Sequence, residues 1–404
     1  MPSRSAFQFL HAADLALDAP VFGVADLPGP ARDVLLDARY LAARRVFDAA
    51  LEADVDFVVL AGNVLGKGYG VRAAYFLVEQ FARLQQAEIP VYWVERTVTG
   101  AMEWPRFVPW PETVMRADAN IGQVWNVTRE DRPLARLVAC CDGARQRRVV
   151  QAAATGQPNT FEIHVMPQST LDALPDRLAD YWALGGQPAA TSVPGTGGRA
   201  RFCGQPQGMH PDDVGPRGCQ LVTVEPDGSL FHQFVETNAV RWYRESVAVD
   251  SGSDRLSFRT AVESRYRRIA SETTASLAIV RWDVTGHGDL MQSLHGDAAS
   301  GELLGLLRSL APESPTIWSL SVDATAGAAH CQQLESDEHP LATVAAELDR
   351  LEADDPRLQR VLEEVAGQLG EDLSVPEPKF LDRIRKRARA EVIRRIGDSE
   401  SLRS

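Results

Sequence analysis

The chain has 404 residues and a formal net charge of −13 at pH 7, with 45% hydrophobic and 24% charged residues. This length exceeds one ordinary hydrophobic core, so we expect two domains and an extension. The acidic charge argues against a protein built around a broad basic surface for nucleic acid, although it leaves room for a local basic patch. No apolar run is long enough for a membrane helix, and the N-terminus lacks a long apolar signal stretch, which predicts a cytoplasmic protein.

Common catalytic signatures are missing from the sequence. The five cysteines include no CxxC pair and no spacing suited to zinc. Cys140 and Cys141 lie in the apolar run RLVACCDG, which favours burial in a strand. No Ser-His-Asp order or dinucleotide fingerprint is present, and Gly195, Gly197 and Gly198 lack the following helix that a phosphate-binding glycine motif requires.

The first 240 residues alternate short apolar strands with segments of helical period, which is typical of a layered α/β domain. Strands are predicted at 7–12, 57–61, 91–94, 136–140, 161–166 and 220–224. Helices are predicted over 37–53 and 71–86. Residues 185–208 are rich in glycine and proline, so we expect a long loop there.

The pattern changes near residue 241, where a second and smaller α/β domain is predicted to begin. Helices are expected over 257–270 and 302–310, and strands over 277–284 and 316–322. We therefore expect domains at 1–240 and 241–335, followed by a charged helical tail at 336–404.

The tail carries two helical segments of opposite charge, separated by Pro376 and Pro378. Residues 341–373 contain nine acids and three bases, a net of −6, whereas residues 379–396 contain eight bases and two acids, a net of +6. The basic segment has one apolar helical face. Three roles stay open for it: folding back on the acidic segment, docking on helices of a partner, or contacting nucleic acid.

Five segments follow one another at suitable intervals between residues 5 and 245. They are FLHAADLALD (9–18), VDFVVLAGNVLG (55–66), IPVYWVERTVTG (89–100), DYWALGGQPAA (180–190) and CGQPQGMHPDDVGPRGCQLVTVEPDG (203–228). Together they resemble the SbcD/YhaO-type DNA-repair exonucleases of the calcineurin-like metallophosphoesterases. The last segment is similar to the family's stretch PGSPQGRHFGETGPKGC. One strand-plus-glycine segment alone is a weak signal, but five in order are a strong one.

This resemblance implies a four-layer calcineurin-like β-sandwich flanked by helices, with a small α/β capping domain and a helical C-terminal tail. Family members hold two metal ions, usually manganese, through carboxylates and imidazoles at strand ends. The two ions activate water and clamp the scissile phosphate. Because two neighbouring cations repel each other, such a site needs anionic ligands, above all a bridging aspartate.

Most positions of the family's metal ligands carry other residues in this chain. Asp14 is kept, but the histidine expected two residues later is Ala16, and the bridging aspartate after Gly62 is Asn63. The Gly-Asn-His-Asp/Glu motif falls on Arg96, Thr97, Val98 and Thr99, and the Gly-His-x-His motif falls on Gly185, Gly186, Gln187 and Pro188. Asp14 and Asn63 thus remain as vestigial metal positions. One acid and one neutral amide are too few to hold two cations, and Asp14 is expected to form or cap a turn.

The histidines do not replace the lost ligands. His164 lies in the strand FEIHVMPQ, but the family's register puts the ligand at Pro167, so we expect His164 to be a packing or surface residue. His210 matches a family histidine outside the metal motifs, and a structural role is expected. The remaining histidines share no metal spacing: His11, His232, His287, His295, His330 and His339.

The lost ligands and the resemblance together favour a non-catalytic subunit. In the family, the segment after the capping domain contacts an SbcC/YhaN-type ATPase, so such an ATPase is the expected partner, in DNA end processing. DNA contact stays open without support from the net charge, and no cofactor or membrane partner is expected. The alternatives are an active metal-dependent exonuclease or phosphodiesterase with a rebuilt site, and a vestigial cleft that binds a regulatory ligand.

Overall fold

The structure is a computed structural model of the 404-residue chain. It describes residues 5–21, 23–24, 27–66, 70–95, 104–119, 121–139, 160–167, 179–294, 297–312 and 316–326. The predicted tail at 336–404 and the pair Cys140–Cys141 lie outside these residues. None of the described helices is long and apolar enough to cross a membrane.

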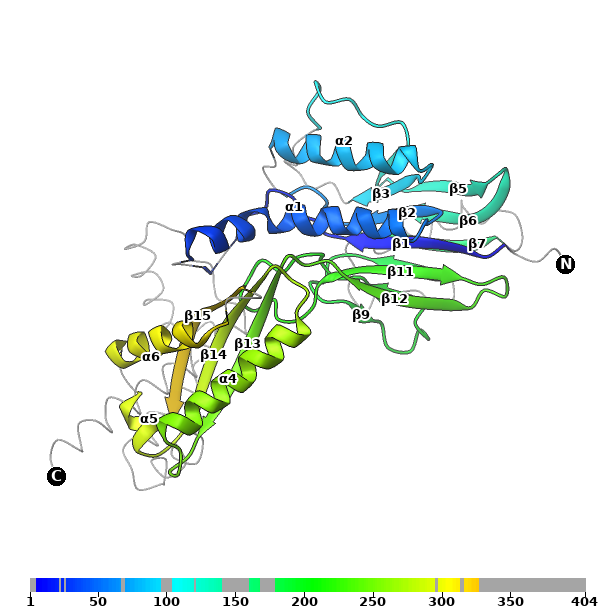
Figure 1. The fold of residues 1–404 in the computed structure, drawn as a ribbon. Coiled ribbons are helices and arrows are strands. Elements are labelled where there is room, and N and C mark those ends of the chain that lie inside the picture. The colour runs from blue at the N-terminus through cyan, green and yellow to red at the C-terminus, as the bar shows by residue number, and fades with distance from the viewer. Residues whose placement is uncertain are drawn as a thin grey trace, which may run out of the picture. The chain divides into compact units, whose positions relative to one another are not determined.

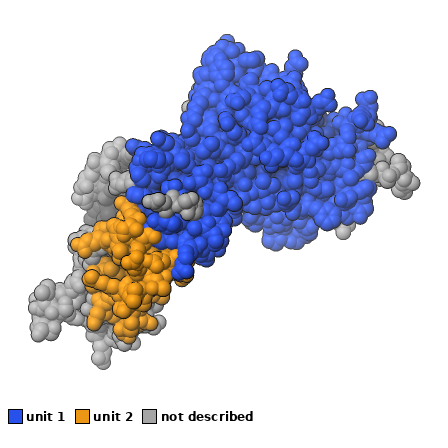
Figure 2. Space-filling view, in the orientation of Figure 1, with its two compact units in different colours: residues 1–244, 266–281, 311–320 blue, residues 245–265, 282–310, 321–404 orange. Residues whose placement is uncertain are grey.

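The chain forms two compact units (Figure 2). Unit 1 takes the described residues of 1–244, 266–281 and 311–320, and unit 2 takes those of 245–265, 282–310 and 321–404. Each unit is therefore assembled from separate stretches of the chain. The domain limits expected from the sequence stay predictions.

Unit 1 contains two six-stranded mixed sheets (Figure 1). The first has the order β12-β11-β1-β2-β3-β4, with β1 to β4 parallel and β11 and β12 antiparallel. Its strands are β1 (Phe7–Ala13), β2 (Phe57–Ala61), β3 (Val91–Glu95), β4 (Val114–Asp118), β11 (Gly218–Val224) and β12 (Leu230–Glu236). The second has the order β5-β6-β7-β8-β10-β9. Its strands are β5 (Gln123–Arg129), β6 (Arg132–Ala139), β7 (Phe161–Met166), β8 (Tyr181–Leu184), β9 (Thr191–Ser192) and β10 (Ala200–Phe202).

The two sheets pack face to face through an aromatic core. Phe9 of β1 stacks on Phe57 of β2 with ring centroids 5.0 Å apart, and Tyr181 of β8 meets Phe9 edge-on at 5.4 Å. Alternate residues of β7, Ile163 and Val165, enter the same buried cluster. Because strand side chains alternate between faces, this cluster fixes which residues of each strand point between the sheets.

Two helices cover the other face of the first sheet (Figure 1): α1 (Gly29–Glu52) and α2 (Val71–Gln86). In α2, Ala73, Leu77 and Leu84 are fully buried at helical spacing, which explains why this helix begins and ends where the sequence predicts. Helix α1 begins eight residues before the predicted 37–53 segment. Its added turns bury Ala31 and Leu35 in a separate hydrophobic cluster, so tertiary packing extends the helix.

The remaining elements follow residue 240. Strands β13 (Val240–Val249), β14 (Leu277–Gly286) and β15 (Thr316–Ala326) form a three-stranded sheet. The helices are α4 (Arg255–Glu272), α5 (Asp289–Ser293) and α6 (Asp297–Leu310). In unit 2, Leu303 and Leu307 of α6 are buried one helical turn apart.

The mixed α/β class is confirmed, and several details differ from the sequence prediction. The expected loop at 185–208 is wrong in part, because it contains the short strands β9 and β10. Strands β4, β5, β8, β12 and β13 were not among the predicted strands; β5 and β12 have mostly exposed or half-buried side chains and thus a weak apolar signal. The four-layer arrangement, the capping role of the second domain and the helical tail stay predictions.

A buried glutamine in the CGQPQG segment holds the end of the second sheet to β13. Gln207 is 2% exposed, and its amide nitrogen donates to the carbonyls of Gly208 and Val240, both at 2.8 Å. Its amide oxygen accepts from the backbone N–H groups of Ala239 (2.8 Å) and Val240 (3.1 Å). One side chain thus bonds to four buried backbone groups, of which the Gly208 carbonyl also accepts from the indole N–H of Trp242.

Replacing Gln207 with leucine is expected to lower the free energy of unfolding by about 3 kcal/mol, since it leaves several buried backbone groups without partners. Urea denaturation followed by circular dichroism measures this loss. Gln233→Leu, at an exposed position of β12, is the matched control and should change stability by less than about 0.5 kcal/mol. Equal effects of the two variants would contradict the role assigned to Gln207.

His11 introduces an acid-sensitive group into the core between the sheets. It is fully buried, and burial, with further effects of His232 and Arg201, lowers its pKa from 6.5 to about 3. The unfolded chain therefore binds a proton between these two values and the folded chain does not, so stability falls as the pH drops through this window.

We predict that His11→Gln flattens the loss of unfolding free energy between pH 6.5 and pH 3, where each unit is worth up to about 1.4 kcal/mol. Urea denaturation at several pH values gives the slope. His210→Gln, which removes an imidazole that is 44% exposed, is the control and should keep the wild-type slope. An unchanged slope in His11→Gln would rule out this account.

Candidate functional site

Asp14 follows β1 directly and lies in a tight loop against the loop after β2. The first loop is left-handed at three non-glycine residues, with φ of 52° at Asp14, 45° at Ala16 and 64° at Asp18. Such a backbone is uncommon for these residue types and persists only where surrounding contacts hold it. The contacts are four backbone hydrogen bonds: Asp14 N to Ala61 O (3.0 Å), Ala16 N to Asn63 O (2.8 Å), Leu17 N to Val64 O (3.0 Å) and Gly66 N to Leu17 O (2.7 Å).

The carboxylate of Asp14 joins this pair of loops to a third one. Its Oδ1 accepts from the backbone N–H of Asn63 at 2.9 Å, and its Oδ2 accepts from that of Gly186, after β8, at 2.7 Å. Only 8% of the residue is exposed. Burial raises the pKa of Asp14, and the hydrogen bonds from Asn63 and Gly186 act against that rise. Asp14 thus ties three strand ends together, as a capping residue does.

Two glycines allow the loops to approach so closely. Gly62 is left-handed (φ +81°), and a Cβ at this position would lie 2.3 Å from Oδ1 of Asp14. A Cβ at Gly185 would lie 2.8 Å from the carbonyl oxygen of Pro167. Any side chain at either position would push the loops apart.

The other ligand positions of the motif comparison supply no strong metal ligand. Asn63 contributes its backbone to the contact with Asp14, and the residue is exposed. Ala16 has only a methyl group, 8% exposed, while Gln187 and Pro188 are exposed. The segment 96–99 lies outside the described residues. The assignment of Asp14 and Asn63 as vestigial metal positions stays a prediction.

His164 lies on the face of β7 that points away from the core between the sheets. It is fully buried, its Nε2 is 2.6 Å from Oε1 of Glu162, and its ring meets Trp182 edge-on at 4.5 Å. Pro167, at the end of the strand, is the residue that lies against Gly62 and Gly185. This geometry agrees with the register argument, which made His164 a packing residue.

The stretch around His210 has a structural role in this chain. Asp213 Oδ2 accepts from the backbone N–H groups of Met209 (2.8 Å) and His210 (3.0 Å), which closes the turn. The His210 ring accepts from the backbone N–H of Asp212 at 3.1 Å. Arg217, 5% exposed, donates to the carbonyl of Pro188 and so holds the loop after β8 in place. The motif thus supports the loop that reaches Asp14.

The donor set does not fit the two metal ions that the resemblance implies. Asp14 is the acid whose side chain joins the three loops, and both of its oxygens already accept backbone N–H groups. Within the described residues, no group of three or more His, Cys, Asp or Glu could hold a metal ion. Since a pair of cations needs several anionic or imidazole ligands, no catalytic step through metal ions is derived for these residues.

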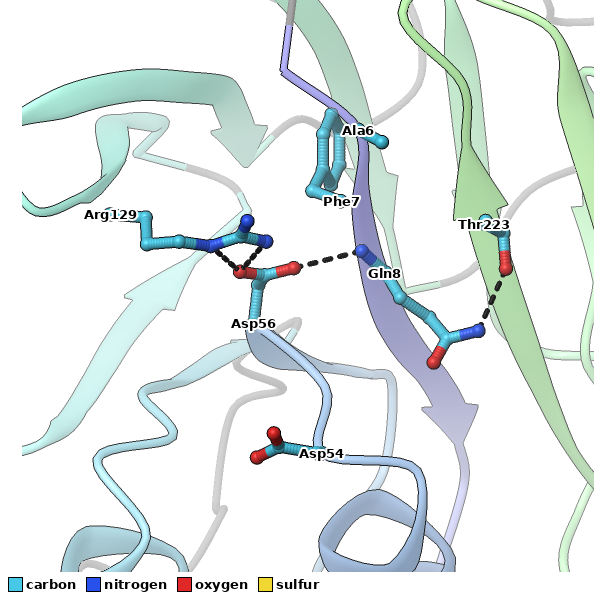
Figure 3. Close-up of a pocket in the computed structure, with 7 residues that line it drawn as sticks. All are labelled: Ala6, Phe7, Gln8, Asp54, Asp56, Arg129 and Thr223. Carbon is cyan, nitrogen blue, oxygen red and sulfur yellow. Dashed lines mark hydrogen bonds and ion pairs between the residues drawn. The ribbon is translucent and has the colours of Figure 1, made fainter.

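A shallow pocket of about 320 Å³ lies at the other end of β1 (Figure 3). Asp56 forms an ion pair with Arg129 and accepts from the backbone N–H of Gln8 at 2.9 Å. The side chain of Gln8 donates to Thr223 at 2.7 Å. These polar groups satisfy one another, whereas the carboxylate of Asp54 lines the pocket without an interaction with the other residues drawn.

Sequence reasoning missed a second polar cluster, which lies between the sheets. His11, Gln220 and His232 belong to three neighbouring strands of the first sheet, and Arg201 belongs to the second. The histidines were set aside because they share no metal spacing. The sequence pattern that could have indicated this cluster is the alternation of side chains in β1, which puts His11 on the same buried face as Phe9.

The chain was compared with known proteins. No family model matches it. It is 26% identical over 333 residues to the uncharacterized metallophosphoesterase YhaO of Bacillus subtilis strain 168, and the match covers 78% of this chain and 81% of that protein. The similarity spans most of both chains and agrees with the mixed α/β fold built on parallel strands whose ends meet at Asp14. By this comparison the chain is similar to a metallophosphoesterase over most of its length.

Proposed function

We propose that this chain is a catalytically degenerate metallophosphoesterase homologue that serves as a non-catalytic subunit. The observation that carries the proposal is the state of Asp14, whose carboxylate is buried and accepts two backbone hydrogen bonds. In a two-metal site, an aspartate at this strand end would direct its oxygens at a cation. In this chain the same oxygens hold three loops of the protein together.

The neighbouring residues strengthen this interpretation. Asparagine at position 63 keeps the shape of an aspartate without the charge, and alanine at position 16 removes an imidazole. A buried carboxylate can attract one cation, but two cations a few ångströms apart require more negative charge than Asp14 supplies. The loss is spread over several motifs, so no single nearby residue compensates for it.

The proposed partner is an SbcC/YhaN-type ATPase, and the proposed process is DNA end processing. Support comes from the resemblance and from the C-terminal sequence. The segment 379–396 has a net charge of +6 and apolar residues at helical spacing, which suits docking on the helices of another protein. The preserved fold then has a purpose without chemistry, since it presents this segment to the partner.

Metal content distinguishes this proposal from an active exonuclease or phosphodiesterase. We expect the purified full chain, dialysed against manganese, to retain no stoichiometric metal by elemental analysis. We also expect no hydrolysis of bis(p-nitrophenyl) phosphate or linear DNA above a buffer blank. The physical reason is the missing set of anionic and imidazole ligands.

The variants Asp14→Ala and Asp33→Ala complete this test. Asp33→Ala is the matched control, because Asp33 is an exposed residue of α1. Both should behave like the wild type in metal content and hydrolysis. Asp14→Ala alone should lower stability, by about 2 kcal/mol, since two backbone N–H groups lose their acceptor. Manganese-dependent hydrolysis that Asp14→Ala abolishes and Asp33→Ala keeps would overturn the proposal.

Binding to the ATPase tests the second half of the proposal. The full chain should co-purify with the coiled-coil ATPase of its own organism, and the double variant Arg385→Glu/Arg389→Glu should weaken that binding at least about tenfold by reversing two charges of the segment 379–396. The variant Arg259→Glu, in the exposed face of α4, is the matched control and should bind like the wild type. Equal binding by the double variant, or no binding by the wild type, would contradict the docking role.

A further inference from the structure

A cluster of polar side chains lies between the two sheets of unit 1, away from the loop of Asp14. Its members are His11 on β1, Gln220 on β11, His232 on β12, and Tyr181 and Arg201 on β8 and β10. The strands β12 and β9 are the edges of their sheets, and β10 adjoins β9. The cluster thus runs from the middle of the sandwich towards one open side of it.

Strand pairing brings the first-sheet members together. His11 and Gln220 are direct cross-strand partners, and His232 lies two residues along from the partner of Gln220 on β12. All three share the face that carries Phe9 and Val222 into the core between the sheets. Gln220 is 1% exposed and His11 is fully buried.

Tyr181 connects this group to the second sheet. Its hydroxyl lies 3.1 Å from Nδ1 of His11, and its ring stacks on that of His232 with centroids 5.8 Å apart. When the hydroxyl donates to Nδ1, the neutral imidazole of His11 carries its proton on Nε2. Gly198, in the loop before β10, lies against the His232 ring.

Arg201 adds a positive charge that has no counter-ion among the described residues. Ala200 and Phe202 belong to the cluster on the outer face of the second sheet, whereas Cys203 belongs to the core between the sheets. Because side chains alternate along a strand, Arg201 points between the sheets as Cys203 does. In the described part of the chain it makes no ion pair or side-chain hydrogen bond, and its Nε is buried without a partner. After burial, which is the largest effect, the charge of Arg201 lowers the pKa of His232, and it also acts on His11. Among the described residues, no carboxylate contributes to the pKa shift of His11 or His232.

Several polar atoms of the cluster lack a hydrogen bond among the described residues. They are both amide atoms of Gln220, one ring nitrogen of His232 and Nε of Arg201. His11 has a backbone hydrogen-bond partner in Leu184, and His232 has one in Gly198. A buried polar atom without a partner costs about 1–3 kcal/mol, and native proteins satisfy such atoms with water or a ligand. Four of them in one place therefore point to a bound species.

The charge of the cluster selects the kind of ligand. An uncompensated guanidinium repels a cation, and the available donors are N–H groups of arginine, imidazole and amide. We propose that Arg201, His232 and Gln220 form a binding site for a small oxyanion of the phosphate type, with Nε2 of His11 behind it. Arg201 and His232 are half-buried, and Gln220 supplies the buried amide donor.

Inorganic phosphate is the probe for this site. Isothermal titration of the full chain at constant ionic strength should give saturable binding, and Arg201→Gln should weaken it at least about tenfold because a charge-assisted hydrogen bond is lost. Arg199→Gln is the matched control, since Arg199 is exposed, lies two residues earlier and carries the same charge. Equal affinity in the two variants, or no saturable binding by the wild type, would overturn the proposal.

Wild-type crystals soaked in tungstate provide a test that does not depend on the folding of a variant. The anomalous signal should lie within hydrogen-bond distance of Arg201 and His232. A signal confined to other places on the protein would reject the site. Neither result depends on whether Asp14 binds metal. A failure of this proposal is therefore distinguishable from a failure of the proposed function.

Discussion

The arrangement of the candidate site depends on the carboxylate of Asp14 and its two backbone donors, the N–H groups of Asn63 and Gly186. These bonds join the loops after β1, β2 and β8, which come from both sheets of the sandwich. A charged acceptor makes hydrogen bonds about twice as strong as a neutral one, and burial removes the competition from water. Gly62 and Gly185 then become necessary, since a Cβ at either position would meet Asp14 or Pro167. These contacts thus explain the position of the aspartate.

Support for the same loops comes from the stretch that resembles the family most closely. Gln207 bonds to backbone groups of β13 and of Ala239, the residue before that strand. Arg217 holds the loop after β8 through the carbonyl of Pro188. Such interactions would preserve a surface in the non-catalytic subunit proposed above. A protein whose value lies in its shape, such as a docking subunit, keeps these contacts and can lose ligands at little cost. The pattern of kept and lost residues is therefore the one expected for the proposed function.

Much of the fold could be predicted from the sequence, because β2, α2 and β7 are short apolar runs or regular helical stripes with clear ends. The start of α1 could not, since its first turns are stabilised by Ala31 and Leu35 in a tertiary cluster. Sequence reasoning found Asp14 as a capping residue, but its partners are backbone N–H groups 49 and 172 positions away, which no side-chain pattern records. The polar cluster had the same difficulty, because His11 and Gln220 become neighbours only through the antiparallel pairing of β1 and β11.

The electrostatic field changes sign over a short distance along β1. Burial, and after it the negative charge of Asp14, raises the pKa of the Cys203 thiol. His11, three residues before Asp14, responds to positive groups instead, because after burial its pKa is lowered by His232 and Arg201. The net charge of −13 does not reveal this local contrast, because it sums the charges of the whole chain. A cation entering the sandwich would be drawn to the Asp14 end and an anion to Arg201. The local charge at each end of β1 therefore says more about the ligands it could take than the overall acidity of the chain does.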